Sequence, residues 1–283
     1  MQVVADFPCR CGEAPLWHPQ HALLYWVDVD TGKMYAYDPQ SRTALRVQHG
    51  DIIGGMTLQD DGQLLLFMER GQIALWSPEK GLQVQQDHTP GAEKTRFNDV
   101  IADPQGRVFA GTMPEGDTPG KVYRLDTDGS LRVVIPEVGQ PNGMGFSPDR
   151  RTFYLTDTRK RRIESFQYEQ ISGELRDRQT LIETPPECGQ PDGMTVDEAG
   201  NLWLAHWDGS CILRYDPLGT LLETIAMPVR NVTSLTFVGH TVYITSAGGG
   251  DRPQAGPQAG ALFQLEAEVA APPEYCSRVR FCN

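Results

Sequence analysis

The sequence predicts an all-β protein, a six-bladed β-propeller with a metal site in its central channel. Three observations favour the fold: the apolar runs are short and rich in β-branched and aromatic residues, helical spacing is missing, and one segment recurs about every 45 residues. A β-sandwich would show turn signals without a register of this period. By length the chain could hold two domains, but six blades use all of it, so we expect one domain over residues 1–283.

The expected strands are short runs separated by glycine and proline. The chain has 29 Gly and 21 Pro, and they are scattered along its length rather than gathered in a linker. In chain order the expected strands are 23–28, 33–37, 63–68, 72–76, 107–112, 121–125, 152–156, 162–168, 202–206, 211–215, 241–245 and 261–265. They come in pairs, and each pair follows a similar segment.

That segment is clearest at 141–149 and 191–197, where Pro-Asn-Gly-Met and Pro-Asp-Gly-Met stand in the same frame. Aligning all six copies gives register positions 13, 54, 98, 142, 192 and 233, spaced by 41, 44, 44, 50 and 41 residues. A unit of this length with about four strands has the size of a propeller blade. One blade cannot bury both of its faces alone, so the copies are expected to stack around an axis.

The register positions are polar where small or apolar residues would be enough for packing. The innermost strand of each blade runs along the channel, so equivalent residues form a ring around it. In chain order these residues are Glu13, Gly54, Asn98, Asn142, Asp192 and Thr233. Two carboxylates near a low-dielectric interior are costly unless a cation offsets them. We therefore expect Glu13, Asn142 and Asp192 to hold one divalent cation.

All three expected ligands bind through oxygen. Ca²⁺, our first expectation, suits such a set, as do Mg²⁺ and Mn²⁺, whereas Zn²⁺ accepts carboxylates but prefers nitrogen and sulfur. Three protein ligands would leave positions open to water and substrate, which favours a catalytic site over a structural one. The alternative is that these polar residues only hydrogen-bond neighbouring blades around a water-filled channel.

Further motifs occur in order and at consistent spacing along about residues 9–266, at 12–17, 24–28, 96–99, 110–113, 141–143 and 191–194. Together they resemble the senescence-marker-protein/gluconolactonase family, the regucalcin-like sugar lactonases. The resemblance implies a six-bladed propeller that hydrolyses an aldonolactone, such as gluconolactone, to the aldonic acid with one divalent metal in the channel. It also implies Glu13, Asn142 and Asp192 as the metal ligands, in agreement with the register argument.

The resemblance implies contacts to the substrate as well. Asn98 resembles the residue beside the metal that contacts the substrate or a water on the metal, and Arg96 resembles the arginine that binds sugar hydroxyl and carbonyl oxygens. Some members place a second acid after a Gly-Thr-Met-x-Glu stretch to hold the substrate. Here Glu115 stands at that place but Gly116 follows it, which puts this contact in doubt.

A lactone is an ester, so its hydrolysis needs a polarised carbonyl, an activated water and a stabilised oxyanion. We expect Asp192 to act as general base, with one oxygen on the metal while the other takes a proton from water. Glu13 would then be chiefly a ligand, while Arg96 and Asn98 orient the sugar. Two alternatives stay open, a calcium-dependent hydrolase of organophosphates or aryl esters and a non-enzymatic calcium-binding or protein-binding propeller.

Charge and composition exclude other classes. Lys+Arg 25 against Asp+Glu 37 gives a net charge of −12, which argues against nucleic acid and anionic membranes as partners. The longest apolar run, 64–68, is far below the roughly 20 residues that span a bilayer. The partner we expect is a small sugar lactone, and no obligate protein partner is evident. No signal peptide is recognisable and the six cysteines lack C-x-x-C spacing, so we expect free thiols in the cytoplasm.

Four other features receive simpler interpretations. His206 is expected to be an ordinary packed or exposed histidine, and the basic run 159–162 a solvated hairpin turn. Asp99 is expected to cap a turn or hold a neighbour in place. The Gly-rich stretch 248–260 is expected to form a mobile loop near the channel mouth.

Overall fold

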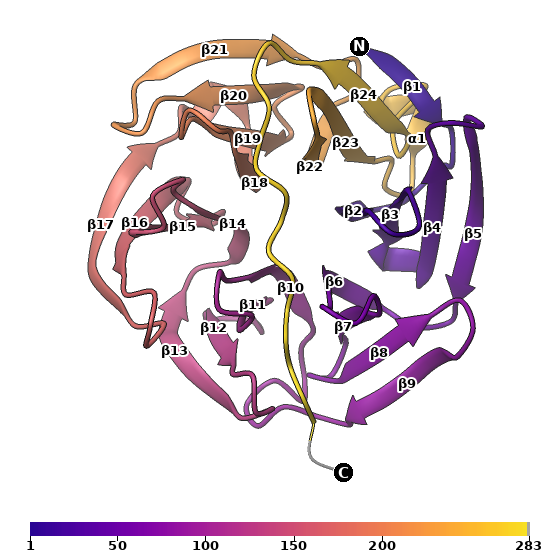
Figure 1. The fold of residues 1–283 in the computed structure, drawn as a ribbon. Coiled ribbons are helices and arrows are strands. Elements are labelled where there is room, and N and C mark those ends of the chain that lie inside the picture. The colour runs from indigo at the N-terminus through magenta and orange to yellow at the C-terminus, as the bar shows by residue number, and fades with distance from the viewer. Residues whose placement is uncertain (282–283) are drawn as a thin grey trace.

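Six four-stranded sheets form a ring in the computed structural model, which describes residues 1–281 (Figure 1). We number these sheets as blades 1 to 6 in chain order. Within each blade, neighbouring strands run antiparallel. The all-β six-bladed propeller expected from the repeats is therefore confirmed.

The strands of each blade follow one another from the channel to the rim, and neighbouring innermost strands contact one another around the ring. From blade 1 to blade 6 the innermost strands are β2 (Gly12–His18), β6 (Ile53–Leu58), β10 (Phe97–Ala102), β14 (Pro141–Phe146), β18 (Gln190–Val196) and β22 (Asn231–Val238). The second strands are β3 (Leu23–Asp28), β7 (Leu64–Met68), β11 (Val108–Thr112), β15 (Thr152–Asp157), β19 (Leu202–Trp207) and β23 (Thr241–Ala247). The third strands are β4 (Lys33–Asp38), β8 (Ile73–Ser77), β12 (Gly120–Leu125), β16 (Arg162–Tyr168), β20 (Cys211–Tyr215) and β24 (Leu262–Glu266). The outer strands are β5 (Thr43–His49), β9 (Gly81–Gln86), β13 (Leu131–Val138), β17 (Leu175–Glu183), β21 (Leu221–Ala226) and β1 (Gln2–Ala5).

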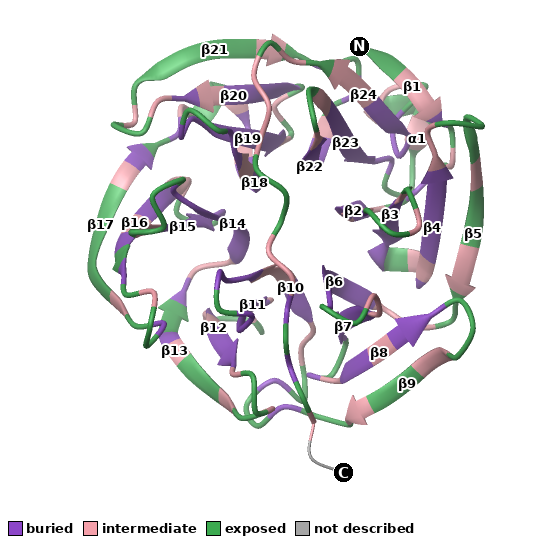
Figure 2. Cartoon of the chain, in the orientation of Figure 1, coloured by how far each residue is buried: buried purple, intermediate pink, exposed green. Residues whose placement is uncertain are grey.

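The second and third strands agree with the twelve expected strands to within two residues. The outer strands were missed because they carry weak apolar signals. Most residues of β5 and β21 are exposed, and exposed residues line the rim of the ring (Figure 2). Three short helices complete the elements, namely η1 (Val29–Thr31), η2 (Pro186–Cys188) and α1 (Arg252–Ala255).

The ring is closed by strand exchange between the two ends of the chain. The first strand, β1, pairs with β24, so that Val3 lies opposite Phe263. Blade 6 thus takes three strands from the C-terminal part of the chain and one from the N-terminal part. The repeat did not predict this closure, because β1 precedes the first copy of the recurring segment.

Buried apolar side chains form six clusters, one between each pair of neighbouring blades. Strand β7 shows why its sequence is continuously apolar. Leu64 and Leu66 face the cluster shared with blade 1, whereas Leu65 and Phe67 face the cluster shared with blade 3. Because successive strand residues point to opposite faces, a strand covered on both sides must be apolar throughout.

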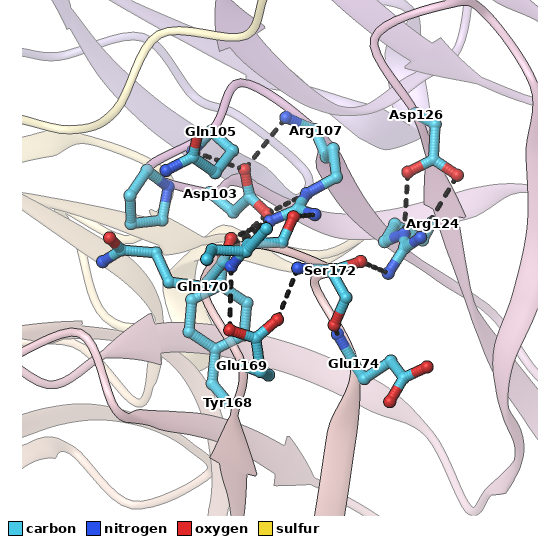
Figure 3. A network of polar contacts seen from close by, with 12 residues as sticks. Asp103, Gln105, Arg107, Arg124, Asp126, Tyr168, Glu169, Gln170, Ser172 and Glu174 are labelled. Atoms are coloured by element: carbon cyan, nitrogen blue, oxygen red, sulfur yellow. Dashed lines mark hydrogen bonds and ion pairs between the residues drawn. The ribbon is translucent and has the colours of Figure 1, made fainter.

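A buried ionic network joins blades 3 and 4 (Figure 3). The Nε atom of Arg107 lies 2.5 Å from Oδ2 of Asp103, and the Tyr168 hydroxyl donates to the same oxygen at 2.8 Å. The guanidinium of Arg107 also donates to the carbonyl oxygens of Ile171 and Gln170. These bonds fasten the loop between β16 and β17 against blade 3.

The last described segment, residues 267–281, crosses one mouth of the ring, and we call it the C-terminal strap (Figure 1). It is fixed to blade 5, where Glu198 N–H donates to the carbonyl of Ala270, and to blade 2, where Ser277 N–H donates to that of Leu58. Because Leu58 ends its innermost strand, the strap covers the mouth opposite the register residues, which lie near the strand starts.

Two further sequence expectations concern the stretch 248–260 and the cysteines. Gly248 N–H donates to the carbonyl of Cys9, so the stretch 248–260 begins at the channel end where β2 starts, and its mobility stays a prediction. Five of the six cysteines are free thiols, and Cys282 lies outside the described residues. No helix among the described residues is long and apolar enough to cross a membrane.

Candidate functional site

The register residues lie together at one end of the channel. Glu13, Asn98 and Asn142 are each the second residue of their innermost strand, and Asp192 is the third. The pairing with the second strand is interrupted at Asn98, Asn142 and Asp192, and directly after Glu13, which still pairs with Val27. The interruption releases Asn98, Asn142 and Asp192 from the ladder, so that their side chains do not have to follow the alternation of the strand.

The glycine after two register residues allows neighbouring innermost strands to approach closely. A Cβ atom on Gly143 would lie 2.2 Å from the backbone nitrogen of Met194. On Gly193 it would lie 2.4 Å from Oγ of Ser234. The Pro-Asn-Gly and Pro-Asp-Gly segments therefore carry glycine because a larger residue would push the blades apart where the polar ring forms.

The four register residues named in the site are buried, with exposed fractions of 7% for Glu13, 7% for Asn98, 3% for Asn142 and 5% for Asp192. Among the described residues, Glu115 makes no hydrogen bond to any of these four. Glu115 is exposed and forms an isolated bridge with Thr118 in the turn after β11. Its contact with substrate stays a prediction.

The two register carboxyls stand in an unfavourable electrostatic environment. Burial raises the pKa of Glu13 well above its ordinary value, and the charges of Asp192 and Asp99 raise it further. Burial also raises the pKa of Asp192, with a further contribution from Asp99, whereas Asn142 and Arg96 lower it. Without a cation the site thus favours protonated carboxyls, because ionising them would bring like charges together.

Asp99 belongs to this acidic group, a role that the sequence analysis missed. Burial raises the pKa of its carboxyl to about 7, and Arg96 opposes the shift. Its side chain lines the channel cavity below the register residues. A signal was available, because Asp99 directly follows the register residue Asn98.

Asn142 provides the clearest test of whether the site suits a cation. Its Nδ2 atom donates to Oγ1 of Thr158 over 3.1 Å. Its Oδ1 atom is buried and has no hydrogen-bond partner among the described residues. Buried polar atoms without partners are rare in proteins, and a cation that such an oxygen could coordinate would satisfy it.

The donor set itself also suits a hard cation. Among residues 1–281 no group of three or more His, Cys, Asp or Glu side chains is placed to hold a metal. The expected set has only two carboxylates, Glu13 and Asp192, and its third ligand is the carboxamide of Asn142. An all-oxygen set of this kind suits Ca²⁺ or Mg²⁺ rather than Zn²⁺.

Arg96 and Asn98 contact each other. Nη1 of Arg96 donates to Oδ1 of Asn98 over 2.7 Å and to the carbonyl of Phe97 over 2.9 Å. Nδ2 of Asn98 donates to the carbonyl of Pro141 over 2.9 Å. Both polar atoms of the Asn98 side chain thus have protein partners, whereas within residues 1–281 no protein acceptor takes the Nε or Nη2 hydrogens of Arg96.

Acidic residues at the ends of second strands hold the segments that lead into the site. Oδ1 of Asp28 accepts from the backbone N–H of Cys11, two residues before Glu13. Asp157 accepts from the N–H groups of Gly139 and Gln140, just before β14. These carboxylates fix the entry of the chain into the innermost strand.

In blade 5 the position that corresponds to Asp157 is occupied by a histidine, since His206 pairs with Pro191 as Asp157 pairs with Pro141. His206 is fully buried, and its Nδ1 atom lies 2.8 Å from the carbonyl of Cys188, which places the proton on Nδ1. His206 is therefore packed rather than exposed, and its buried Nε2 atom has no hydrogen-bond partner among the described residues. In the basic run 159–162, residues 159–161 lie in the turn between β15 and β16, and Arg162 begins β16.

Below the register residues the channel holds a cavity of about 330 Å³. Its wall combines apolar side chains, such as Met144 and Met194 from the innermost strands, with charged residues that include Asp99. The strap contributes Glu274 and Tyr275 to the opposite end. The polar ring is therefore backed by a cavity that the strap covers.

Comparisons with known proteins agree with this fold. The family model described as the SMP-30/gluconolactonase/LRE-like region matches residues 11–248. A pentonolactonase of Haloferax volcanii is 43% identical over 98% of both chains, and the regucalcin of Macaca fascicularis is 31% identical over 91% of both. The crystal structure of the calcium-binding protein regucalcin from Agrobacterium tumefaciens superposes with a TM-score of 0.90 at 24% identity, covering 98% of this chain and 97% of that one.

The matched region begins just before Glu13 and includes every register residue of the channel. The resemblance seen in the motifs is thus supported over most of the chain by whole-length relatives. The chain belongs to the SMP-30/gluconolactonase family.

Proposed function

We propose that this chain, acting as one domain in the cytoplasm, hydrolyses a sugar lactone to the aldonic acid with the help of one divalent cation. Glu13, Asn142 and Asp192 would hold the cation, and Ca²⁺ is the ion we favour. The observation that carries the proposal is the buried, unpartnered Oδ1 of Asn142 beside two buried carboxyls whose pKa values are raised. The relatives named as lactonases support the reaction class.

When bound, a divalent cation supplies Lewis-acid polarisation of a carbonyl and lowers the pKa of water. Asp192 accepts the proton of the water that attacks the lactone carbonyl carbon. As the bond from that carbon to the ring oxygen breaks, Asp192 returns the proton to the ring oxygen, which becomes the hydroxyl of the product. Glu13 serves as a ligand and as a second negative charge that keeps the cation in place.

Arg96 is the residue best placed to bind the substrate. Its Nε and Nη2 hydrogens are available, and its charge lies close enough to lower the pKa values of Glu13, Asp99 and Asp192. It can therefore donate to sugar oxygens and offset the negative charge that develops on the carbonyl oxygen. Asn98 fixes the guanidinium, so we assign it a positioning role for Arg96 in addition to the contact expected from the sequence.

The net charge of −12 fits a small neutral substrate. A neutral lactone needs no basic funnel, and the aldonate product, an anion, leaves an acidic surface readily. No nucleic acid, membrane or obligate protein partner enters this proposal.

Metal replacement tests the proposed function directly. The metal-depleted protein would be supplied with Ca²⁺, Mg²⁺, Mn²⁺ or Zn²⁺ and assayed against glucono-, galactono-, xylono- and arabinono-lactone, and against a paraoxon-like ester. We expect turnover of a lactone that depends on added cation. Preferential turnover of the paraoxon-like ester would favour the alternative ester hydrolase, and cation binding without any turnover would favour a binding protein.

A pair of charge-removing variants assigns the base. Asp192→Asn should lower kcat by about 10²–10⁴-fold at saturating cation, because the proton acceptor is lost. Glu187→Gln is the matched control, since Glu187 is an exposed carboxyl in η2, just before the same strand. Near wild-type turnover by Asp192→Asn would exclude Asp192 as the base.

A further inference from the structure

The backbone carbonyl just before each proposed ligand accepts a hydrogen bond from a side chain of the preceding blade. Thr233 of blade 6 donates to the carbonyl of Gly12 over 2.6 Å. Asn98 of blade 3 donates to Pro141 over 2.9 Å, and Thr158, in the turn after β15 of blade 4, donates to Pro191 over 2.8 Å. The three donors are buried. Each proposed ligand thus follows a peptide group that the neighbouring blade holds in place.

Thr158 also forms a hydrogen bond with the side chain of a proposed ligand, Asn142, which the other two donors do not do. Its hydroxyl carries one hydrogen, and the carbonyl of Pro191 can only accept, so Thr158 must donate to it. The oxygen of Thr158 therefore accepts from Asn142, and only the Nδ2 atom of the carboxamide can donate. This chain of bonds fixes the orientation of the amide, with Nδ2 toward Thr158 and Oδ1 away from it.

The fixed amide explains why Oδ1 of Asn142 lacks a partner. Had the amide the opposite orientation, its oxygen would face the oxygen of Thr158, whose only hydrogen is already donated. The same hydroxyl holds the peptide group that leads into Asp192. The Thr158 side chain therefore orients the carboxamide oxygen of Asn142 in blade 4 and holds the peptide group that precedes Asp192 in blade 5.

We propose that Thr158 is a positioning residue of the cation site, which sets Asn142 and Asp192 relative to each other across blades 4 and 5. This inference rests on the proposed function, because it takes these two residues as ligands. By the same geometry Thr233 positions Glu13 from blade 6. Groups that orient metal ligands in this way commonly change metal affinity by 10- to 100-fold when they are removed.

Isothermal titration of the metal-depleted protein with Ca²⁺ tests the proposal without reference to activity. Thr158→Val, which keeps the shape and removes the hydroxyl, should weaken Ca²⁺ binding by about 10- to 100-fold. Thr158→Ser keeps the hydroxyl and should restore binding to within about threefold of the wild type. Thr156→Val is the matched control, because Thr156 is buried on β15, two residues before Thr158, and its hydroxyl has no hydrogen-bond partner among the described residues.

The outcomes separate this inference from the proposed function. If the wild type binds Ca²⁺ and Thr158→Val binds it equally well, the positioning role is wrong while the cation site stands. If the wild type binds none of the four cations, both proposals are wrong. Should Thr158→Val fail to fold, Thr233→Val provides the second test, because it removes the bond to the peptide before Glu13, together with a bond to the Thr245 hydroxyl, and should also weaken Ca²⁺ binding.

Discussion

Nη1 of Arg96 donates to Oδ1 of Asn98 over 2.7 Å, and Nδ2 of Asn98 donates to the carbonyl of Pro141 over 2.9 Å. Because Pro141 directly precedes Asn142, the residue proposed to bind substrate is linked through one side chain to a residue proposed to bind the cation. The two parts of the site are thus parts of one hydrogen-bonded structure. Their effects on catalysis should not be independent.

Variants of Arg96 and Asn98 test this coupling. Arg96→Lys keeps the charge but loses the planar fork, so kcat/KM for a lactone should fall by about 10- to 100-fold. Asn98→Ala should lower kcat/KM as well, because it frees the guanidinium. In the double variant the losses should not add, since each change breaks the same bond. Strictly additive losses, measured at saturating cation, would contradict the coupling.

The register residues could be identified from the sequence because, in a propeller, positions that repeat along the chain come together in a ring around the axis. Glu13, Asn142 and Asp192 are far apart in the chain, yet equivalent positions meet at the axis in every blade. The repeat therefore located the residues that the structure gathers at one channel end. Asp99 was missed because it lies one position outside the aligned column.

Other features could not be predicted because they depend on contacts between blades. Thr158 lies 16 residues after Asn142 and belongs to no repeated position, so nothing in the sequence marks its hydrogen bond. The outer strand β21 is mostly exposed and has no apolar alternation to reveal it. The strap follows the last repeat, and its path across the channel is fixed by single bonds such as that from Ser277 to Leu58.

The metal-depleted protein should lose stability as the pH rises. The pKa values of Glu13 and Asp192 are raised in the folded state, and that of Asp99 is raised to about 7, so the folded protein binds protons more tightly than the unfolded chain. Such groups contribute stability below their ordinary pKa values, and the contribution is lost as the pH rises through the raised ones. The Tm without metal should therefore be higher at pH 5 than at pH 8.

Added cation should reverse this trend, because it binds the ionised carboxyls and stabilises the folded state. Melting curves at pH 5, 6, 7 and 8, with a chelator or with millimolar Ca²⁺, would measure both effects. Glu13→Gln should flatten the curve of the metal-depleted protein, since one buried acid is removed. If the Tm of the metal-depleted Glu13→Gln variant changed with pH as that of the metal-depleted wild type does, the electrostatic description of the site would be wrong, because His206 contributes equally to both curves.

His206 should make the protein sensitive to acid. Burial lowers its pKa to about 4, so the folded protein keeps the imidazole neutral while the unfolded chain takes up a proton below pH 6.5. The stability that depends on the neutral ring is present above pH 6.5 and lost as the pH falls toward 4, by about 3 kcal/mol in all. His206→Asn should lose correspondingly less stability between pH 7 and pH 4 in urea titrations. Equal losses in both proteins would show that His206 is not the group that titrates.

The ionic network of Figure 3 should matter for stability and not for turnover. Arg107→Met leaves Asp103 buried with its main partner removed, which should cost about 3–5 kcal/mol of unfolding free energy. Removing the acid as well, in Asp103→Asn with Arg107→Met, should recover part of that loss. Denaturant titration measures the stability, and kcat of the folded variants should equal that of the wild type. A smaller loss for the single variant than for the double variant would contradict a buried pair.

The strap should stabilise the ring without contributing to the cation site, because it covers the opposite mouth. Ending the chain after Glu268 removes the bond between Ser277 and Leu58 and the buried side chain of Val279. These losses should lower the free energy of unfolding by roughly 3 kcal/mol or more, and hence the Tm by about 6–12 °C. The lining of the channel cavity would also become accessible to solvent at the mouth that the strap covers. A dye that binds apolar surface should therefore fluoresce more strongly.

Ca²⁺ affinity separates this structural role from a catalytic one. Titration of the truncated protein below its melting temperature should give a Kd within about threefold of that of the full chain, because Glu13, Asn142 and Asp192 lie at the other end of their strands. Arg280→Gln is the control, since it breaks an exposed ion pair of the strap with Asp60 and should change stability by less than about 1 kcal/mol. A truncated protein that melts like the wild type but binds Ca²⁺ weakly would instead mean that the strap acts on the site through the channel.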